Sequence, residues 1–367
     1  MTPEKPVLKV GLVGSGFMGR CHAHAFRSVS GLFDLPLLPV AEMLADISDE
    51  AATRNATALG FARATGDWRA LCANPCIDVV AVTAPNALHE PIVMAALEAG
   101  KHVYCEKPLS TTLESAQRMT EAAQKAGVVT MVGFNFLRNP MIRLARDLIR
   151  DGEIGEITSF NGRHAENYMS DPDAAHSFRT DPEGGGALAD IGSHIVSMAC
   201  YLIGPIVEAS GQSKTIHKTR PIRPGASERT PVLVDDVTQA LVRFESGATG
   251  MIEANWAATG RTMDLSWEIT GTKGAIRFSQ ERMNELLLCR GSAGGLTSGF
   301  LKIEAGPKHQ PYAEFCPAPG HHLGFNDLKV IEVAELVRAI SGEENVGPDF
   351  AEALRVQMTI SAIAASC

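Results

Sequence analysis

Apolar and polar positions along the first third of the chain form short β-prone runs, each followed by helical spacing. A β-prone run at residues 9–13 leads into a glycine loop and a helical segment at 20–28. The alternation then repeats, with strands predicted at 40–46, 77–82, 103–107 and 128–134 and helices at 49–59, 90–99 and 112–126. Strands that alternate with helices in this way predict a parallel, doubly wound sheet of the α/β class.

The pattern changes after about residue 136. A helix at 140–151 and a strand-like run at 157–163 precede a polar loop at 164–186, whose length suggests a functional role. Period-two runs joined by short turns then predict antiparallel strands with hairpin connections, and helices close the chain; these runs are 238–245, 250–256 and 264–270, and the helices are 326–340 and 350–365. Because 367 residues suit two domains, we predict one at 1–136 and a second at 137–367.

Composition narrows the class of protein. With 45% hydrophobic and 20% charged residues, the chain resembles an ordinary soluble globular protein. The net charge of −9 argues against nucleic-acid binding. No apolar run approaches the roughly 20 residues of a membrane helix, and residues 1–9 lack a signal-peptide core. Among eight scattered cysteines, Cys72 and Cys76 have no matching second pair, so we predict no metal site and reduced thiols in a cytoplasmic protein.

The glycine loop carries the first chemical signal. Gly14-Ser15-Gly16-Phe17-Met18-Gly19 is a G-x-G-x-x-G pattern between a predicted strand and a predicted helix. Glycines there allow a tight turn and close approach of the backbone to a pyrophosphate, and the helix N-terminus offers N–H groups to that anion. We therefore predict that Gly14, Gly16, Phe17, Met18 and Gly19 bind a dinucleotide.

Asp46 ends the second predicted strand. A carboxylate there can accept hydrogen bonds from the adenosine ribose hydroxyls and would repel a 2′-phosphate. Ile47 and Ser48 follow it rather than an arginine, which favours NAD over NADP. An N-cap role for the next helix is the alternative, and it is compatible with binding.

Three further residues are candidates for proton transfer. Lys107 lies at the carboxyl edge of a predicted parallel strand that Pro108 ends, and a lysine desolvated there can exchange protons. Asp190 and His194 are four residues apart, so on a helix they share a face, where a carboxylate can orient an imidazole. The alternatives are a surface lysine, a helix cap and a packed histidine.

Taken together, the motifs resemble the glucose-fructose oxidoreductase/inositol dehydrogenase (Gfo/Idh/MocA) family of sugar and polyol oxidoreductases. The resemblance rests on the glycine loop, Ala84-Pro85-Asn86-Ala87-Leu88-His89, residues 99–103, Glu106-Lys107-Pro108 and residues 186–194, in that order. It implies an N-terminal Rossmann domain and a C-terminal α+β domain with a large, mostly antiparallel sheet. Because that sheet often mediates oligomers in the family, we expect a homodimer or homotetramer.

The resemblance also implies roles for individual residues. Lys107, Asp190 and His194 match the residues around the reacting carbinol. Residues 320–325, Gly-His-His-Leu-Gly-Phe, are similar to a Gly-His-Pro-x-Gly-Tyr motif of levoglucosan dehydrogenase-like members. Asn86, His89, Glu106 and Asn135 match positions that line the cofactor in relatives, and we add Thr83 and Lys107 to the predicted cofactor contacts. On the substrate side the motif at 320–325 suggests His321, and Lys107 lies near the same carbinol. Arg138, Tyr168 and Arg179 are further substrate candidates because their side chains can bond hydroxyls; a structural role is the alternative for each of these three.

The activity that follows is hydride transfer between a sugar or cyclic polyol carbinol and NAD. His194, oriented by Asp190, would take the hydroxyl proton while Lys107 polarises the oxygen; Lys107 as the base is the alternative. Two other classes stay open, a glycosidase that uses NAD transiently and a non-catalytic NAD-binding regulatory protein.

Overall fold

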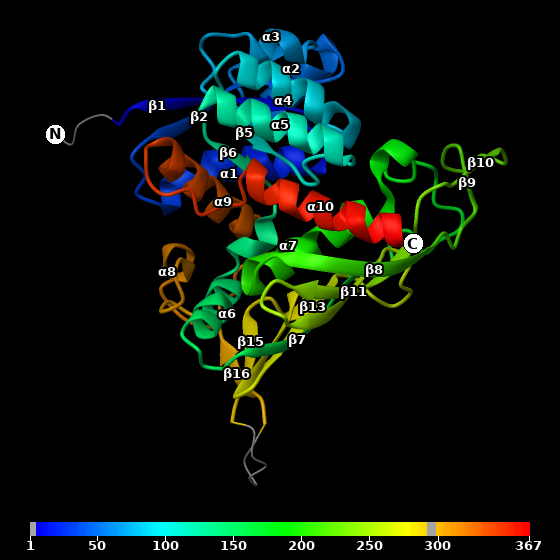
Figure 1. Cartoon of the computed structure of the whole chain (residues 1–367). Coiled ribbons are helices and arrows are strands. Elements are labelled where there is room, and N and C mark those ends of the chain that lie inside the picture. Colours follow the sequence, from blue (N-terminus) through cyan, green and yellow to red (C-terminus); the bar gives the residue numbers. More distant parts are fainter. Residues whose placement is uncertain (1–4, 292–298) are drawn as a thin grey trace. The chain divides into compact units, whose positions relative to one another are not determined.

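In the computed structural model, which describes residues 5–291 and 299–367, the N-terminal part of the chain forms a six-stranded parallel sheet (Figure 1). The strand order is β3-β2-β1-β4-β5-β6, so the direction of winding reverses between β1 and β4. Open α/β sheets bind ligands at such a reversal. The predicted parallel sheet is confirmed; its strands are β1 (Val7–Val13), β2 (Leu38–Ala45), β3 (Arg63–Thr65), β4 (Val79–Val82), β5 (His102–Cys105) and β6 (Thr130–Val132).

Local sequence signals set the ends of the helices beside this sheet. The Ser48 side chain caps α2 (Asp49–Leu59), and Gly60 ends it with φ +79°, a conformation that glycine adopts without strain. Thr112 and Gly127 do the same for α5 (Leu113–Ala126). The other helices are α1 (Phe17–Leu32), α3 (Trp68–Cys72), α4 (His89–Glu98) and α9 (Phe325–Ile340).

The chain divides into two compact units. Unit 1 comprises residues 1–138 and 324–354, and unit 2 comprises residues 139–323 and 355–367. The first change of unit lies close to the boundary expected at residue 136. However, residues 324–354, which hold α9 and the first turn of α10 (Phe350–Ser366), return to unit 1, where α9 packs on α1. Unit 2 is therefore not one continuous segment.

Unit 2 is built on an eight-stranded mixed sheet of order β16-β15-β14-β13-β7-β12-β11-β8. The hairpins β11–β12 and β13–β14 form as expected, but β7 inserts between β12 and β13 and runs parallel to β12. A separate two-stranded sheet pairs β9 (Thr219–Pro221) with β10 (Arg229–Pro231). The large sheet comprises β7 (Ile157–Ala165), β8 (Ile206–Lys214), β11 (Val237–Phe244), β12 (Thr249–Asn255), β13 (Asp264–Gly271), β14 (Gly274–Ser279), β15 (Glu285–Arg290) and β16 (Leu301–Glu304).

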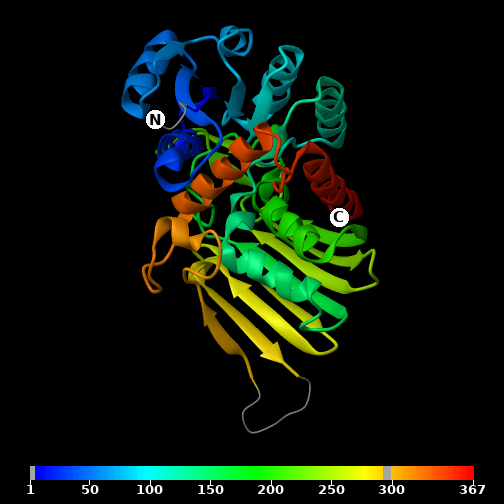
Figure 2. The ribbon, with the colours of Figure 1, turned by 90° about the vertical axis from the view of Figure 1, so that its left-hand side faces the viewer.

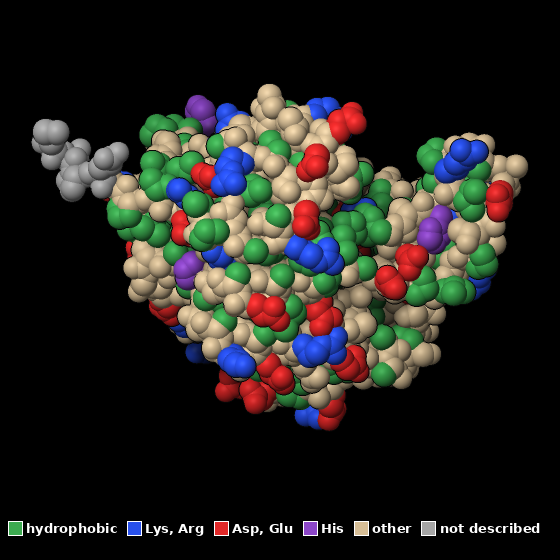
Figure 3. All heavy atoms as spheres, turned by 90° about the horizontal axis from the view of Figure 1, so that it is seen from above, with side chains coloured by type: hydrophobic (Ala, Val, Ile, Leu, Met, Phe, Trp, Pro, Cys, Tyr) green, Lys and Arg blue, Asp and Glu red, His purple; other side chains and the backbone are tan. Residues whose placement is uncertain are grey.

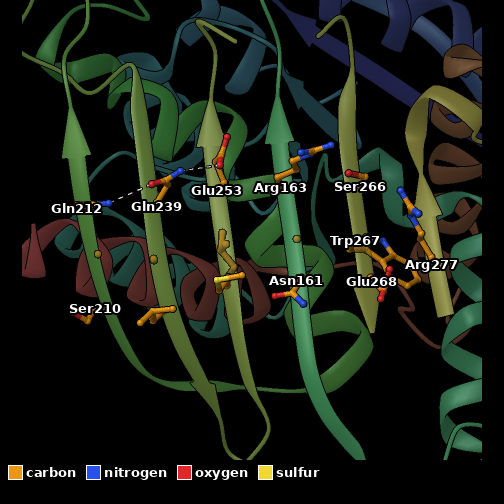
Figure 4. A pocket seen from close by; sticks show the side chains of 16 residues that line it. Asn161, Arg163, Ser210, Gln212, Gln239, Glu253, Ser266, Trp267, Glu268 and Arg277 are labelled. Carbon is orange, nitrogen blue, oxygen red and sulfur yellow. Dashed lines mark hydrogen bonds between the residues drawn. The ribbon is translucent and has the colours of Figure 1, made fainter. Parts of the chain in front are cut away.

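Among the described residues, the helices of unit 2 that contact this sheet cover one of its faces (Figure 2). The helices α6 (Pro140–Arg150) and α7 (Ser193–Ile203) pack there, and Ile363 of α10 lies against Gly211 of β8. The opposite face carries exposed side chains such as Leu241 and Met251 among polar ones. A hollow of about 790 Å³ extends over that open face (Figure 4).

Unit 2 contains one apolar stretch longer than the sequence was expected to have. Among the described residues, Pro182–Ile203 is apolar and long enough to cross a membrane by length and composition alone, whereas no such run was expected. Of its most apolar 18-residue window, 83% is buried within the structure, as in the core helix of a folded domain. On the face of the described residues that Figure 3 shows, basic and acidic side chains are interspersed without a continuous basic area.

Candidate dinucleotide and substrate sites

The glycine loop between β1 and α1 has the backbone that the dinucleotide fingerprint requires. Gly14 has φ +95°, and a Cβ on Gly19 would lie 2.2 Å from the Gly14 carbonyl oxygen. Thr83 Oγ1 donates to the carbonyl oxygens of Val13 and Gly14 at 3.0 and 2.8 Å, so the residue after β4 holds the loop. Beside Gly16, the N-cap of α1, no atom lies within 4 Å of a Cβ position. The helix N-terminus is therefore open to an anion such as a pyrophosphate.

Asp46 lies directly after β2 in a small hydrogen-bonded group. Its Oδ2 accepts hydrogen bonds from Ser15 Oγ and, at 3.0 Å, from Asn55 Nδ2. Asn55 also donates to Ser15 Oγ at 2.6 Å. Burial alone would raise the pKa of Asp46, but these bonds and the Ile47 N–H outweigh burial and lower it, so the carboxylate is ionised. Asn55 belongs to no sequence motif, and its only signal is its position on the helix after Asp46.

Other predicted cofactor positions also suit a bound dinucleotide. Asn135 is 2% exposed, and its Nδ2 donor has no hydrogen-bond partner among the described residues. Phe17 is 69% exposed and stacks on Phe325 at the start of α9, with ring centroids 5.8 Å apart. Met18 lies half-buried in the first turn of α1, and Asn86 begins a short 3₁₀ turn after β4. An unpartnered buried donor, an ionised carboxylate and a close-packed glycine loop fit this group.

Lys107 follows β5, which ends at Cys105 rather than at residue 107 as expected. His89 supports the turn that Lys107 begins. The His89 ring nitrogens lie 2.9 Å from the carbonyl oxygen of Pro108 and 3.0 Å from that of Ala84, and burial lowers the His89 pKa. His89, predicted to line the cofactor, therefore ties together the turns that follow β4 and β5.

Arg138 and Glu106 lie in the interior of unit 1. Arg138 is 1% exposed; its Nη1 pairs with Glu335 at 2.6 Å and donates to the Val346 carbonyl oxygen at 3.3 Å. Because this guanidinium is enclosed by its own unit, we do not retain Arg138 as a proposed substrate contact. Glu106 is 5% exposed and contacts Lys329, a residue that no sequence motif marks.

In unit 2, the structure brings three predicted substrate residues together. Asp190 lies in a π-helical turn, Leu188–Gly192, immediately before α7. Its Oδ2 accepts hydrogen bonds from Tyr168 Oη at 3.0 Å and from Arg179 Nε at 2.9 Å. Tyr168 and Arg179 both come from the long polar loop after β7. Since π-helical turns occur frequently at functional sites, this carboxylate cluster is the candidate substrate site of unit 2.

His194 is the second residue of α7 and is largely buried. Its ring centroid lies 5.5 Å from that of His164 on β7. The His164 ring nitrogens lie 2.9 Å from the Ile191 carbonyl oxygen and 2.8 Å from Glu166 Oε1. Neither residue was predicted from the sequence, because His164 within a strand and Glu166 just after it belong to no motif. Orientation of His194 by Asp190 stays a prediction.

A buried arginine braces the loop that carries Tyr168. Arg220 on β9 is 0% exposed, and its guanidinium donates to the carbonyl oxygens of Met169 at 2.8 Å and Asp171 at 2.9 Å. It also pairs with Asp236 at 3.7 Å, and Asp236 accepts from Trp256 Nε1 at 2.6 Å. This arrangement fixes the backbone just beyond Tyr168.

The last predicted substrate residue, His321, is exposed, with Nδ1 3.3 Å from the Pro319 carbonyl oxygen. The next residue, His322, has φ +63°, and its N–H donates to Tyr312 Oη at 3.1 Å. The family motif that this segment resembles has proline here, and proline is restricted to φ near −65°. The backbone of this loop therefore differs from that of members with proline.

The hollow on the open sheet face is a separate feature. Side chains from β7, β8, β11, β12, β13 and β14 line it, and Asp190, His194, Tyr168 and Arg179 are not among them (Figure 4). Within the described parts of the chain, 5–291 and 299–367, no group of three or more His, Cys, Asp or Glu side chains could hold a metal ion.

Two family models match the chain. Residues 8–134 match an oxidoreductase family described as an NAD-binding Rossmann fold, and residues 142–277 match the GFO/IDH/MocA C-terminal domain. Levoglucosan dehydrogenase from Pseudarthrobacter phenanthrenivorans is 37% identical over 98% of this chain and 96% of that protein. The chain belongs to the Gfo/Idh/MocA family. The prediction of an NAD-dependent oxidoreductase of this family is thereby confirmed.

Solved structures of family members share the whole fold. A structure of a levoglucosan dehydrogenase in complex with NADH and levoglucosan is 38% identical, with a TM-score of 0.94 over 98% of this chain and 97% of that one. An NAD-binding oxidoreductase from Klebsiella pneumoniae is 43% identical, with a TM-score of 0.93 over 98% and 96%. This Gfo/Idh/MocA chain therefore aligns with both solved structures over 98% of its length.

Proposed function

We propose that this protein oxidises a CH–OH group of a pyranose-type sugar with NAD⁺, and that levoglucosan or a closely similar anhydrosugar is its substrate. The observation that carries the proposal is the carboxylate of Asp190, which is held in unit 2 by Tyr168 and Arg179. A sugar offers several hydroxyl groups, and a carboxylate flanked by a phenol and a guanidinium supplies both acceptors and donors for them. The likeness to levoglucosan dehydrogenase over nearly the whole of both chains supports the choice of sugar.

The roles of individual residues follow from their chemistry. His194 accepts the hydroxyl proton of the reacting carbinol, because a neutral imidazole is the side chain best matched to that step near neutral pH. Lys107 donates a hydrogen bond to the same oxygen as negative charge develops on it. Asp190 stabilises the protonated imidazole and binds a neighbouring hydroxyl. When bound, NAD supplies the hydride acceptor at its nicotinamide ring.

The residues that we propose bind the cofactor lie in unit 1. The open N-terminus of α1 receives the pyrophosphate, Asp46 accepts from the adenosine ribose, and the unpartnered Asn135 amide donates to the cofactor. Asn86, Thr83 and His89 shape the turns around it. The ionised Asp46 favours NAD over NADP.

We also propose that the protein is a cytoplasmic homo-oligomer. The open face of the unit 2 sheet exposes 63% of Leu241 and 54% of Met251 beside polar side chains such as Glu253 and Arg277 (Figure 4). A mixed surface of this kind suits packing against a second copy through a self-complementary patch. All eight cysteines are free, which fits a reducing compartment.

The test is NADH formation from a panel of levoglucosan, glucose, galactose and myo-inositol, with NAD⁺ and NADP⁺ in parallel. We expect turnover with levoglucosan and NAD⁺. The variants His194→Ala and Lys107→Ala should each lower kcat by about 10²–10⁴-fold, the usual contribution of general acid–base catalysis.

His24→Ala and Lys125→Ala, which alter exposed residues of the same types, should keep wild-type turnover. Wild-type turnover in His194→Ala would contradict its role as the base. Release of an aglycone from a glycoside without net NADH would replace the dehydrogenase by a glycosidase, and NADH binding without turnover of any sugar would indicate a regulatory protein.

A further inference from the structure

Unit 1 buries an unusual number of charged side chains between the end of β5 and the helix α9. Glu106 follows β5, Lys329, Glu332 and Glu335 lie on α9, and Arg138 lies in the turn after β6; none of them is more than 5% exposed. Burying charges costs free energy even when they are paired, and apolar residues of similar size often give equal stability. Stability alone therefore does not explain this cluster.

Lys329 is the cation that holds the Glu106 carboxylate. Its Nζ lies 2.9 Å from Glu106 Oε1 and 2.7 Å from Glu332 Oε2, and it donates to Tyr104 Oη at 3.0 Å. His22 Nε2 lies 2.7 Å from the same Glu106 oxygen. Burial alone would raise the pKa of Glu106, but Lys329 and His22 outweigh burial and hold it well below its usual range. The carboxylate is therefore charged and fixed in place.

The other oxygen of Glu106 acts on the backbone of the next residue. The Lys107 N–H donates to Glu106 Oε2 at 3.3 Å. On its other side the carboxylate lies so close to Gly133 that a Cβ there would be 2.7 Å from Oε1. A chain of contacts thus runs from Lys329 through Glu106 to the main chain of Lys107.

The same helix also contacts the glycine loop. Phe325, in the first turn of α9, stacks on Phe17, and Lys329 is one helical turn further along. The helix α9 therefore contacts both the glycine loop, through Phe17, and the segment after β5, through Glu106. This gives a physical reason for residues 324–354 to belong to unit 1.

We propose that Lys329 is a positioning residue for Lys107: it fixes the Glu106 carboxylate, which holds the Lys107 N–H and so sets the direction of the Lys107 side chain. The expected effect on catalysis rests on the proposed function, whereas the contacts are observed in the structure. A displacement of about 1 Å in a catalytic group can cost roughly 10²-fold in rate.

The experiment compares Lys329→Met, an apolar residue of similar length, with Glu335→Gln, a near-isosteric change on the same helix at the Arg138 pair. The first readout is hydrogen–deuterium exchange of the Lys107 amide, which needs no substrate. The second is kcat and KM for levoglucosan, with kcat expressed per NADH-binding site so that misfolded protein does not contribute.

In Lys329→Met we expect the Lys107 amide to exchange about tenfold faster or more, because its hydrogen bond opens. We expect kcat per site to fall by about 10²-fold while KM and NADH affinity stay within about threefold. Glu335→Gln should lower the melting temperature and leave both readouts at wild-type values.

A Lys107 amide exchange rate and a kcat at wild-type values in Lys329→Met would overturn the proposal. Glu335→Gln would also overturn it if it changed the exchange rate and kcat as much as Lys329→Met does. Should Lys329→Met fail to fold, Lys329→Gln takes its place, because it keeps a polar side chain that is too short to reach Glu106 as lysine does, and it is read in the same way. A wild-type protein that oxidises no sugar would refute the proposed function, yet the exchange comparison would still decide the role of Lys329.

Discussion

The choice between NAD and NADP provides the sharpest quantitative prediction. Asp46 carries its charge on an oxygen fixed by Ser15 and Asn55, so it cannot readily turn away from a ligand. The perturbation we consider is Asp46→Asn, which keeps the shape of the side chain and removes only the charge. NADP differs from NAD by a 2′-phosphate on the ribose that Asp46 is predicted to bind.

The magnitude follows from the electrostatics of a half-exposed site. Two unit charges about 4 Å apart interact by about 4 kcal/mol at the effective dielectric constant of 20 that suits pairs near a protein surface. Asp46 is partly exposed, so water and salt screen this repulsion, and we take about half, or 2 kcal/mol. Removing it should shift the ratio of NADPH to NADH affinity by about 30-fold toward NADPH.

The assay is fluorescence titration of NADH and NADPH against wild-type protein and Asp46→Asn, which requires no sugar substrate. Glu50→Gln, an exposed carboxylate on the following helix, is the control for a general change in charge. Asn55→Ala should give a smaller shift in the same direction, because it frees the Asp46 carboxylate without removing its charge. An unchanged ratio in Asp46→Asn would refute the assignment of Asp46 to the ribose.

Three further predictions test other parts of the structure. Gly19→Ala should abolish NADH binding because its Cβ would lie 2.2 Å from the Gly14 carbonyl oxygen, whereas Gly31→Ala, with open space around its Cβ, should bind NADH normally in the same titration. Arg220→Ala should raise the KM for levoglucosan severalfold by releasing the loop that carries Tyr168, while calorimetry should find NADH affinity unchanged; a normal KM would exclude this bracing role. Burial and Lys329 lower the pKa of His22, so His22 stays neutral in the folded chain while the same residue in the unfolded chain takes up a proton below pH 6.5. The free energy of unfolding should therefore fall by up to about 1.4 kcal/mol for each pH unit below 6.5. Denaturant titrations of His22→Gln should show a shallower fall.

Much of the nucleotide half of the protein could be predicted from the sequence because its signals are local. The glycine loop, the run before it and the helix after it occupy one short stretch, and Ser48 and Gly60 mark the ends of α2 within a dozen residues of each other. Hydrophobic periodicity and capping residues act between neighbours in the chain, so they can be found without knowledge of the tertiary structure.

Such local signals do not predict which distant segments of the chain pair with one another. Nothing in the periodicity of β12 and β13 indicates that β7, nearly a hundred residues earlier, lies between them. A polar loop could be recognised as functional, but not that its Tyr168 and Arg179 meet on the Asp190 carboxylate. Strand order depends on which distant strands pair, and periodicity within a strand does not specify its neighbour.

Buried charges show the same limit most clearly. The sequence by itself determined that a lysine follows Glu106 at the edge of a parallel strand, and that a dinucleotide loop precedes it. Only the tertiary structure decided that Lys329, more than two hundred residues later, lies against that glutamate, and that Arg138 pairs with Glu335 in the interior. The physical reason is that the sequence of a helix does not show whether a charged residue is exposed or buried. Only the folded chain brings the opposite charge that offsets the free-energy cost of burying it.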